Sequence, residues 1–239
     1  MRELLNFRYI FPLALLLACG EQKAPEAEPA GVTPETEAET EVQHSTSTIL
    51  FYGDSLTAGL GLDTQQAFPA LIGQRLDSLG LDFQVVNAGL SGETTASGVN
   101  RLDWVLRQPV DIFVLELGAN DGLRGIPLSE TRKNLSEIIE RVRNTDPDTR
   151  IILTGMQLPP NMGPAYTAEF RELFPELARQ YNLELVPFLL AGVGGIPELN
   201  QADGIHPTAE GHRILAENVW EVLGPMVAAA LEPKEVVTP

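Results

Sequence analysis

The stretch Ile49-Leu50-Phe51-Tyr52-Gly53-Asp54-Ser55-Leu56-Thr57 decides the fold of this chain. It begins with four apolar or aromatic residues, a run that is typical of a buried strand. Gly53, Asp54 and Ser55 then follow at the carboxyl end of that strand, which is where open α/β sheets place their reactive groups. We therefore take Ser55 as the candidate nucleophile.

Four more apolar runs follow, and they are separated by segments in which apolar residues recur three or four positions apart. This alternation predicts a parallel sheet with right-handed crossovers that place helices on both faces. The expected fold class is therefore α/β, a three-layer α/β/α sandwich with a five-stranded parallel sheet. We expect the later strands at 83–87, 110–117, 150–154 and 183–187, and the helices at 66–79, 95–107, 128–144, 165–181 and 207–231.

A serine hydroxyl is a weak nucleophile at neutral pH, so Ser55 needs a general base and an orienting carboxylate. Asp203 and His206 stand three residues apart, directly before a proline, and one turn can place the carboxylate against one ring nitrogen. The chain has two other histidines. His44 lies in a polar segment without an expected fixed neighbour, and His212 falls inside the last helix, where a surface or core role is expected.

The negative charge that develops on a substrate oxygen needs hydrogen-bond donors, and two loops could supply them. Gly89 follows the second apolar run, and its missing Cβ lets the backbone N–H approach a ligand. Asn120 follows the third run and offers an amide, although an Asn-Asp-Gly sequence is more often a simple turn. Asp54 is expected to make a structural turn hydrogen bond.

These segments resemble the four sequence blocks of the SGNH (GDSL) hydrolase family, and the resemblance spans nearly all of residues 48–231. The blocks are Gly53-Asp54-Ser55-Leu56, Gly89, Gly118-Ala119-Asn120-Asp121 and Asp203-Gly204-Ile205-His206. The resemblance implies a flavodoxin-like fold and a serine esterase with the triad Ser55, His206 and Asp203. It also implies an oxyanion hole formed by the N–H groups of Ser55 and Gly89 and the side chain of Asn120, and no cofactor.

The segment Leu158–Gly163 with Tyr166 is similar to one found in the thioesterase I / lysophospholipase / arylesterase branch of that family. The resemblance implies carboxylic (acyl or aryl) esters, lysophospholipids or acyl thioesters as small-molecule or lipid substrates. Leu158, Met162 and Tyr166 could line the substrate pocket, or they could only pack this loop onto the domain; the sequence leaves both readings open.

Several alternatives compete with this interpretation. Within the same family, the chain could be a polysaccharide O-deacetylase; in another class, it could be a non-catalytic lipoprotein that binds lipid or glycan. The nucleophile elbow of the α/β-hydrolase fold requires Gly-x-Ser-x-Gly, but Thr57 stands where that motif needs its second glycine. An Asp-His pair could also bind a metal, yet no further ligand with zinc-like spacing follows, so no metal is expected.

The charge of the chain bears on its partners. Its 16 basic and 33 acidic side chains give a formal charge of −17, which repels nucleic acids and other polyanions. No obligate protein partner is evident. Much of the acidity is local, because seven glutamates fall within residues 20–47 against one lysine.

The first 18 residues predict export from the cytoplasm. Two arginines precede a short apolar run that suits a signal peptide and is too short to span a bilayer. The next segment, Leu16-Leu17-Ala18-Cys19-Gly20, is similar to a bacterial lipobox, and Cys19 is the only cysteine of the chain. An ordinary secretory signal is the competing interpretation. We expect lipidation at Cys19, which would anchor the protein to a membrane of the bacterial cell envelope, periplasmic or at the cell surface.

The expected domain organisation follows from these segments. It comprises a signal peptide (1–18), the lipidated cysteine with a disordered acidic linker (19–47), an SGNH hydrolase domain (48–231) and a flexible tail (232–239).

Overall fold

The computed structural model describes residues 46–230. The predicted signal peptide, Cys19, nearly all of the acidic linker and the C-terminal tail lie outside the described residues. Within 46–230, no helix combines the length and the apolar character needed to cross a membrane.

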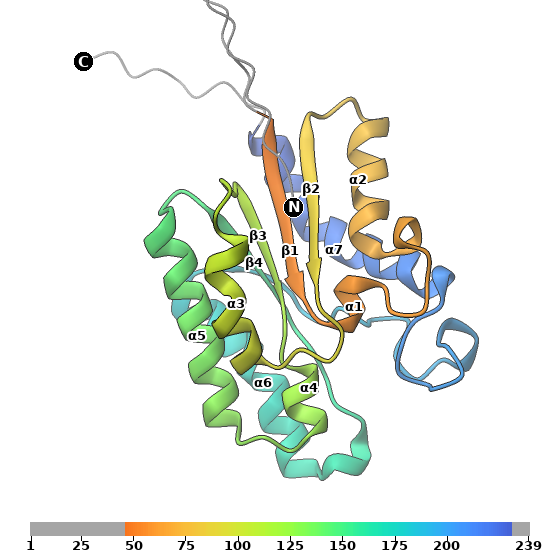
Figure 1. The fold of residues 1–239 in the computed structure, drawn as a ribbon. Coiled ribbons are helices and arrows are strands. Elements are labelled where there is room, and N and C mark those ends of the chain that lie inside the picture. The colour runs from red at the N-terminus through yellow and green to blue at the C-terminus, as the bar shows by residue number, and fades with distance from the viewer. Residues whose placement is uncertain (1–45, 231–239) are drawn as a thin grey trace, which may run out of the picture. The chain divides into compact units, whose positions relative to one another are not determined.

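Five parallel strands form one sheet, as the sequence predicts, and their order is β2-β1-β3-β4-β5 (Figure 1). The first strand lies inside the sheet because the chain leaves it in one direction to form β2 and then crosses back over it to form β3. The strands are β1 (Ser47–Gly53), β2 (Phe83–Gly89), β3 (Ile112–Glu116), β4 (Arg150–Thr154) and β5 (Glu184–Val186).

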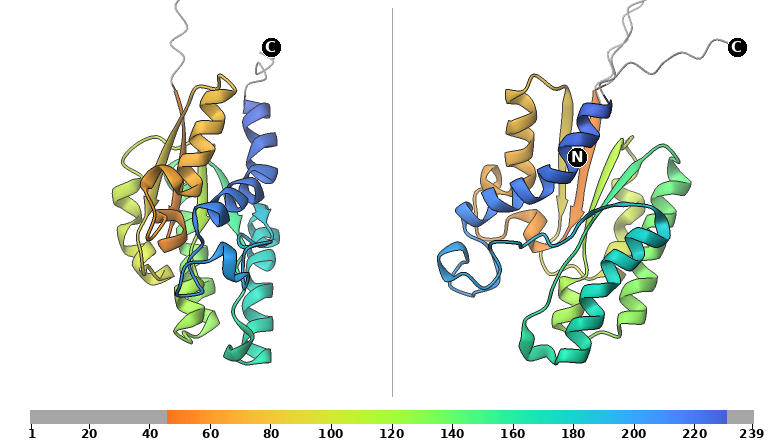
Figure 2. Two further views of the ribbon diagram at one scale, coloured as in Figure 1. Left: turned by 90° about the vertical axis from the view of Figure 1, so that its right-hand side faces the viewer. Right: turned by 180° about the vertical axis from the view of Figure 1, so that it is seen from behind.

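Helices cover both faces of the sheet, as right-handed crossovers require. The pair α2 and α7 pack against each other on one face, and on the other face α5 packs between α3 and α6 (Figures 1 and 2). The longer helices are α2 (Phe68–Ser78), α3 (Thr95–Val105), α5 (Leu128–Thr145), α6 (Pro164–Tyr181) and α7 (Ala209–Ala230). The short ones are α1 (Ser55–Ala58), α4 (Ala119–Leu123) and the 3₁₀ turns Thr64–Gln66, Pro160–Met162 and Pro197–Leu199.

The core is built on the central strands, whose side chains are buried on both faces of the sheet. Every residue of β3 is buried, and so are the last six residues of β1. By contrast, β2 forms one edge of the sheet and none of its side chains is fully buried. The residues that follow β1 and β3 are therefore held by the most deeply packed part of the fold, and these residues carry the candidate site.

Several expected bounds differ from the observed ones by one or two residues, and two differences have an identifiable cause. The segment after β1, expected as a loop, begins with the single-turn helix α1 because the Asp54 carboxylate accepts a hydrogen bond from the Leu56 N–H. The last helix begins at Ala209 and not at Pro207. Thr208 caps it, since its hydroxyl accepts from the Gly211 N–H at 3.3 Å, while Pro207 makes an isolated β-bridge with Asn200.

Candidate active site

The carboxyl ends of three neighbouring strands meet at one place on the sheet edge. Gly53 of β1 is in register with Gly89 of β2 on one side and with Glu116 of β3 on the other. Ser55 follows two residues after Gly53, as the first residue of α1. The candidate nucleophile is therefore placed at the carboxyl edge of the sheet, as the sequence predicts.

The structure brings Ser55, His206 and Asp203 into one hydrogen-bonded chain. The Ser55 Oγ lies 3.0 Å from His206 Nε2, although 151 positions separate the two residues. His206 Nδ1 lies 2.7 Å from Asp203 Oδ2. Since a carboxylate can only accept, Nδ1 carries the imidazole proton, and Nε2 can accept from the serine hydroxyl. This is the arrangement that activates a serine for attack on a carbonyl carbon.

Asp203 is held in its charged form. The His206 N–H donates to Asp203 Oδ1 at 3.0 Å and the Ile205 N–H donates to the same oxygen at 2.9 Å. These bonds, led by the one from the His206 backbone and joined by the one to its ring, hold the pKa of the Asp203 carboxyl well below its usual range. The carboxylate is therefore available to orient the ring at any pH near neutrality.

His212 occupies a different environment, and the structure makes it a core residue. Its ring is buried, its Nδ1 accepts from the Phe68 N–H at 3.1 Å, and it stacks on the Phe68 ring. Burial lowers the pKa of His212 to about 4, with a smaller contribution from His206. Of the surface and core roles expected for His212, the structure shows the core role.

Asn120 lies beside the nucleophile turn, on the first turn of α4. Its Nδ2 donates to Asp54 Oδ2 at 2.9 Å. An amide nitrogen has two hydrogens, so this bond fixes the side chain and leaves one hydrogen for a substrate oxygen. Asp54 is buried and also accepts from the Leu56 N–H at 3.0 Å, which confirms the turn hydrogen bond expected of it.

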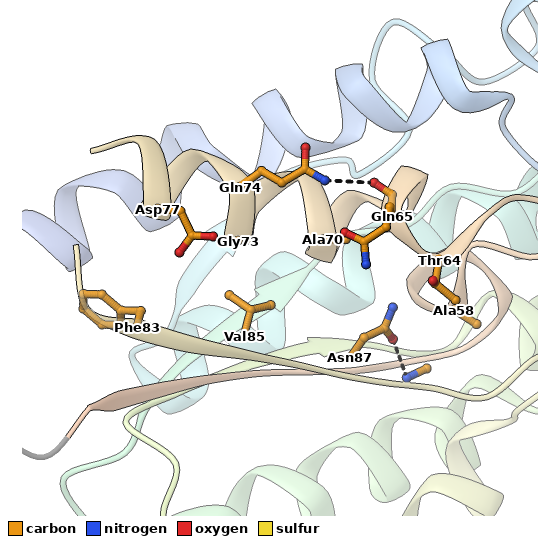
Figure 3. Close-up of a pocket in the computed structure, with 11 residues that line it drawn as sticks. Ala58, Thr64, Gln65, Ala70, Gly73, Gln74, Asp77, Phe83, Val85 and Asn87 are labelled. Carbon is orange, nitrogen blue, oxygen red and sulfur yellow. Dashed lines mark hydrogen bonds between the residues drawn. The ribbon is translucent and has the colours of Figure 1, made fainter. Parts of the chain in front are cut away.

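The prediction for Gly89 as an oxyanion donor is wrong in this geometry. Its N–H already donates to Asn87 Oδ1 at 2.9 Å, as the dashed line from Asn87 in Figure 3 shows. A Cβ at Gly89 would stand 2.3 Å from the backbone nitrogen of Ala58. Glycine is therefore needed here because β2 packs closely against the end of α1, and not because a ligand approaches.

Gly92, three residues after Gly89 in the loop that follows β2, is a residue that the sequence reasoning missed. It has a φ of +80°, and a Cβ there would have only the tip of Arg124 nearby. Arg124 of the α4 segment also donates to the Gly92 carbonyl at 3.0 Å. Within residues 46–230, the Gly92 N–H donates to no protein acceptor, so it has the open backbone donor that Gly89 lacks. The sequence signal was present, since Gly92 stands in a polar glycine-containing loop after a strand.

Glu116 is the second residue that the sequence did not assign to the site. It ends β3 and is buried directly beside the nucleophile turn. Its Oε2 accepts from the Asp54 N–H at 3.1 Å and from the Thr57 hydroxyl at 2.8 Å. Burial and the neighbouring Asp54 carboxylate raise the pKa of Glu116 well above its usual value.

The three residues expected at the substrate pocket, Leu158, Met162 and Tyr166, make different contacts. The Tyr166 hydroxyl donates to the Ile126 carbonyl at 2.7 Å, and the Leu158 methyl groups lie against Gly122. Met162 ends the short 3₁₀ turn and is half-buried. The contacts of Leu158 and Tyr166 favour the packing alternative for those two side chains.

Two pockets lie apart from the triad. One, of about 530 Å³, runs between α2 and the edge strand β2 (Figure 3). The other, of about 310 Å³, lies between Leu158 and the start of α6. Neither is lined by Ser55, Asp203 or His206, so we assign the chemistry to the hydrogen-bonded triad and not to the larger hollow. In the described part of the chain, no cluster of three His, Cys, Asp or Glu side chains could hold a metal ion.

Comparison with known proteins gives a consistent result. Residues 51–214 match the model of the GDSL-like Lipase/Acylhydrolase family. The chain is 43% identical to Esterase TesA of Pseudomonas aeruginosa over 186 residues, covering 77% of this chain and 92% of that protein. It is 37% identical to Thioesterase 1/protease 1/lysophospholipase L1 of Escherichia coli K12, over 75% of this chain and 85% of that one. A crystal structure of TesA superposes with a TM-score of 0.72 at 44% identity, covering 75% of this chain and 99% of that chain.

Proposed function

The chain belongs to the GDSL-like lipase/acylhydrolase (SGNH hydrolase) family and is an ester-hydrolysing enzyme, and from this premise we propose that it works by acyl transfer through Ser55, His206 and Asp203. The observation that carries the proposal is the continuous chain of hydrogen bonds from Ser55 Oγ through the His206 ring to the Asp203 carboxylate.

The reaction has two steps. Ser55 Oγ attacks the carbonyl carbon of the ester while His206 Nε2 takes the hydroxyl proton, and Asp203 stabilises the resulting imidazolium. His206 then returns the proton to the leaving alcohol or thiol, which departs and leaves Ser55 acylated. In the second step His206 takes a proton from water, the hydroxide attacks the acyl carbonyl, and the carboxylic acid is released as Ser55 recovers its proton.

The negative charge on the carbonyl oxygen is held by three donors. We assign the Ser55 N–H at the start of α1, the second Nδ2 hydrogen of Asn120, and the Gly92 N–H in place of that of Gly89. The Asn120 assignment is supported by the bond to Asp54, which fixes the amide before substrate arrives. Preorganised donors of this kind contribute about 10²–10³ in rate each.

The substrates proposed are acyl or aryl esters, lysophospholipids and acyl thioesters. The names of the relatives support this range, since one is an esterase and another is a thioesterase and lysophospholipase. We further propose that Cys19 is lipidated and anchors the enzyme in the bacterial cell envelope. An enzyme outside the cytoplasm meets acyl-CoA rarely, so esters and lipids are the preferred substrates.

The test uses the full chain against p-nitrophenyl esters of increasing chain length, from acetyl to palmitoyl. Ser55→Ala is expected to lower kcat by roughly a millionfold if the triad acts as a unit. Ser129→Ala is the matched control, because Ser129 is exposed on α5. A preference for acetyl esters would support the O-deacetylase alternative, and full turnover in Ser55→Ala would overturn the mechanism.

A further inference from the structure

Glu116 holds the segment that carries the nucleophile at two points. The Asp54 N–H donates to Glu116 Oε2 at 3.1 Å, one residue before Ser55. The Thr57 hydroxyl donates to the same oxygen at 2.8 Å, two residues after Ser55. A single carboxyl oxygen therefore joins both sides of the serine to the end of β3.

The other oxygen of Glu116 has no donor. Within residues 46–230, Glu116 Oε1 is the one buried side-chain oxygen or nitrogen that lacks a hydrogen-bond partner. A buried carboxylate with an unpartnered oxygen is costly, whereas a neutral carboxyl group loses far less on leaving water. The side chain is also fully enclosed, with 1% of its surface exposed. These observations favour the protonated form of Glu116.

Asp54 is the ionisable group that faces Glu116, and its surroundings favour the opposite charge state. Each of its oxygens has a donor, from the Leu56 N–H and from the Asn120 amide. Burial raises the pKa of Asp54, whereas its hydrogen bonds and, to a smaller extent, the charge of His206 lower it. On the other side of the turn, Arg101 of α3 donates to the Gly53 carbonyl at 3.4 Å. Burial raises the pKa of both acids, but only Asp54 has donors on both oxygens, so a proton on this pair is favoured on Glu116.

Gly53 makes room for this arrangement. A Cβ at Gly53 would stand 2.5 Å from Glu116 Oε2 and 2.1 Å from the Thr57 hydroxyl oxygen. Any side chain here would displace the carboxyl group from the nucleophile turn. The glycine of the Gly-Asp-Ser sequence is thus matched to a carboxyl group that enters from the neighbouring strand.

We propose that Glu116 is a neutral acid in the working enzyme, that it shares its proton with the Asp54 carboxylate, and that the pair positions Ser55 and the Asn120 amide. Glu116 accepts hydrogen bonds from the Asp54 N–H and the Thr57 hydroxyl, and the Asp54 carboxylate accepts from the Asn120 amide. Glu116 is therefore a positioning residue that need not touch substrate. This inference rests on the roles proposed above for Ser55 and Asn120.

The first experiment measures the proton itself and does not depend on activity. Infrared difference spectra of the full chain at about pH 7 are compared between the wild type and Glu116→Gln. We expect a carboxylic-acid C=O band that disappears in Glu116→Gln and persists in Glu221→Gln, which removes an exposed glutamate of α7. The band should fade as the pH is raised. Absence of a protonated carboxyl band in the wild type would overturn the proposal.

The second experiment tests positioning. Glutamine keeps the acceptor for Asp54 and Thr57 and offers an N–H to the Asp54 carboxylate, so Glu116→Gln should retain at least about ten times the kcat of Glu116→Ala. Both variants should change kcat more than KM. Loss of the Glu116 proton at high pH should also lower the kcat of the wild type, and this loss should be absent from Glu116→Gln, which has no titrating group at this position. Equal kcat in the two folded variants would overturn the positioning role.

The two proposals can fail separately. If Glu116→Ala does not fold, the infrared comparison still decides the protonation state. If Ser55→Ala keeps full turnover, the acyl-transfer mechanism fails and the positioning role of Glu116 fails with it, whereas the protonation state still stands or falls on the infrared band. If Ser55→Ala is inactive and the band is absent, the mechanism stands and the Glu116 inference alone is wrong.

Discussion

At the scale of single residues, His206 and His212 show how surroundings decide the use of one side chain. They stand six positions apart, but His206 bridges a serine and a carboxylate, while His212 is enclosed in the core against Phe68. Burial holds the pKa of His212 at about 4, so the ring stays neutral wherever the enzyme is expected to work. Keeping the ring neutral lowers the stability of the folded protein only at acidic pH.

His212 therefore predicts a specific acid sensitivity of the fold. Its pKa of about 4 in the folded protein lies below the ordinary histidine pKa of 6.5, so the unfolded chain binds more protons between these two pH values. The stability due to the neutral ring is complete above about pH 6.5 and is lost as the pH falls to about 4, which amounts to about 3 kcal/mol. In His212→Asn an amide oxygen can accept from the Phe68 N–H, and position 212 no longer titrates. The loss of unfolding free energy due to His212 between about pH 6.5 and about pH 4 should therefore be absent from this variant.

The measurement is the free energy of unfolding in urea, followed from about pH 4 to about pH 7 for the wild type and the variant. Since other groups also titrate in this range, the difference between the two proteins is the informative quantity. His44→Asn, a change outside the described residues, is the control and should keep the wild-type slope. Parallel curves for wild type and His212→Asn would contradict this account of the buried ring.

The sequence could identify those site residues whose partners lie nearby in the chain. Asp203 and His206 are three positions apart, so their contact was predictable, and Ser55 follows from the strand that precedes it. The hydrogen bond that occupies the Gly89 N–H was not predictable, because the Asn87 side chain that accepts it is itself held by the Thr57 carbonyl, 30 positions earlier in the chain. Glu116 was also out of reach, since its contacts to Asp54 and Thr57 exist only once β1 and β3 are paired.

At the scale of elements, the short helix α4 depends on the glycine before it. Gly118 has a φ of +120°, which side chains with a Cβ rarely adopt, and a Cβ there would stand 3.2 Å from the Phe174 ring. This glycine turns the chain out of β3 and into the helix that presents Asn120. Gly125, after the same helix, also has a positive φ, of +65°, but a Cβ there would meet no neighbour.

Substitution of each glycine by alanine distinguishes the effect of backbone strain on stability from the effect of a displaced Asn120 amide on kcat. Gly118→Ala should lower stability by roughly 1–3 kcal/mol and should also lower kcat at least about tenfold, because α4 must shift and Asn120 with it. Gly125→Ala should lower stability by roughly 1 kcal/mol with little change in kcat. Thermal unfolding and steady-state kinetics on a soluble ester measure both quantities. A Gly118→Ala variant with wild-type kcat would show that the start of α4 does not position the amide.

Element types were easier to predict than element boundaries. Apolar runs placed all five strands, and the signal is continuous in β1 and β3, which are buried inside the parallel sheet. The short helix α1 was expected as a loop and the start of α7 was placed two residues too early, because each helix start is set by a side-chain cap, from Asp54 and from Thr208. A capping side chain accepts a hydrogen bond from a backbone N–H two or three residues away. Many polar residues in the sequence could cap a helix in this way, so the sequence does not show which of them does.

At the scale of the whole molecule, the catalytic domain and its proposed anchor are separable. Every side chain assigned to the chemistry, from Ser55 to His206, lies within residues 46–230. Cys19 lies outside the described residues and is the only cysteine of the chain. If lipidation at Cys19 holds the enzyme on a membrane, its loss should change location without changing chemistry.

Cys19→Ser should therefore move the enzyme from the membrane fraction to the soluble fraction of the bacterial envelope. Its kcat and KM for a short, soluble p-nitrophenyl ester should stay at wild-type values, because the triad is untouched. Its turnover of lysophospholipid presented in vesicles should fall, since an anchor raises the local concentration of enzyme at the lipid surface and the chain, with a charge of −17, has no electrostatic attraction to replace it. Ser45→Ala is the control and should stay with the membrane. Mass spectrometry of the N-terminal peptide gives an independent readout: an unmodified Cys19 in the mature protein would remove the anchor proposal and leave the esterase mechanism intact.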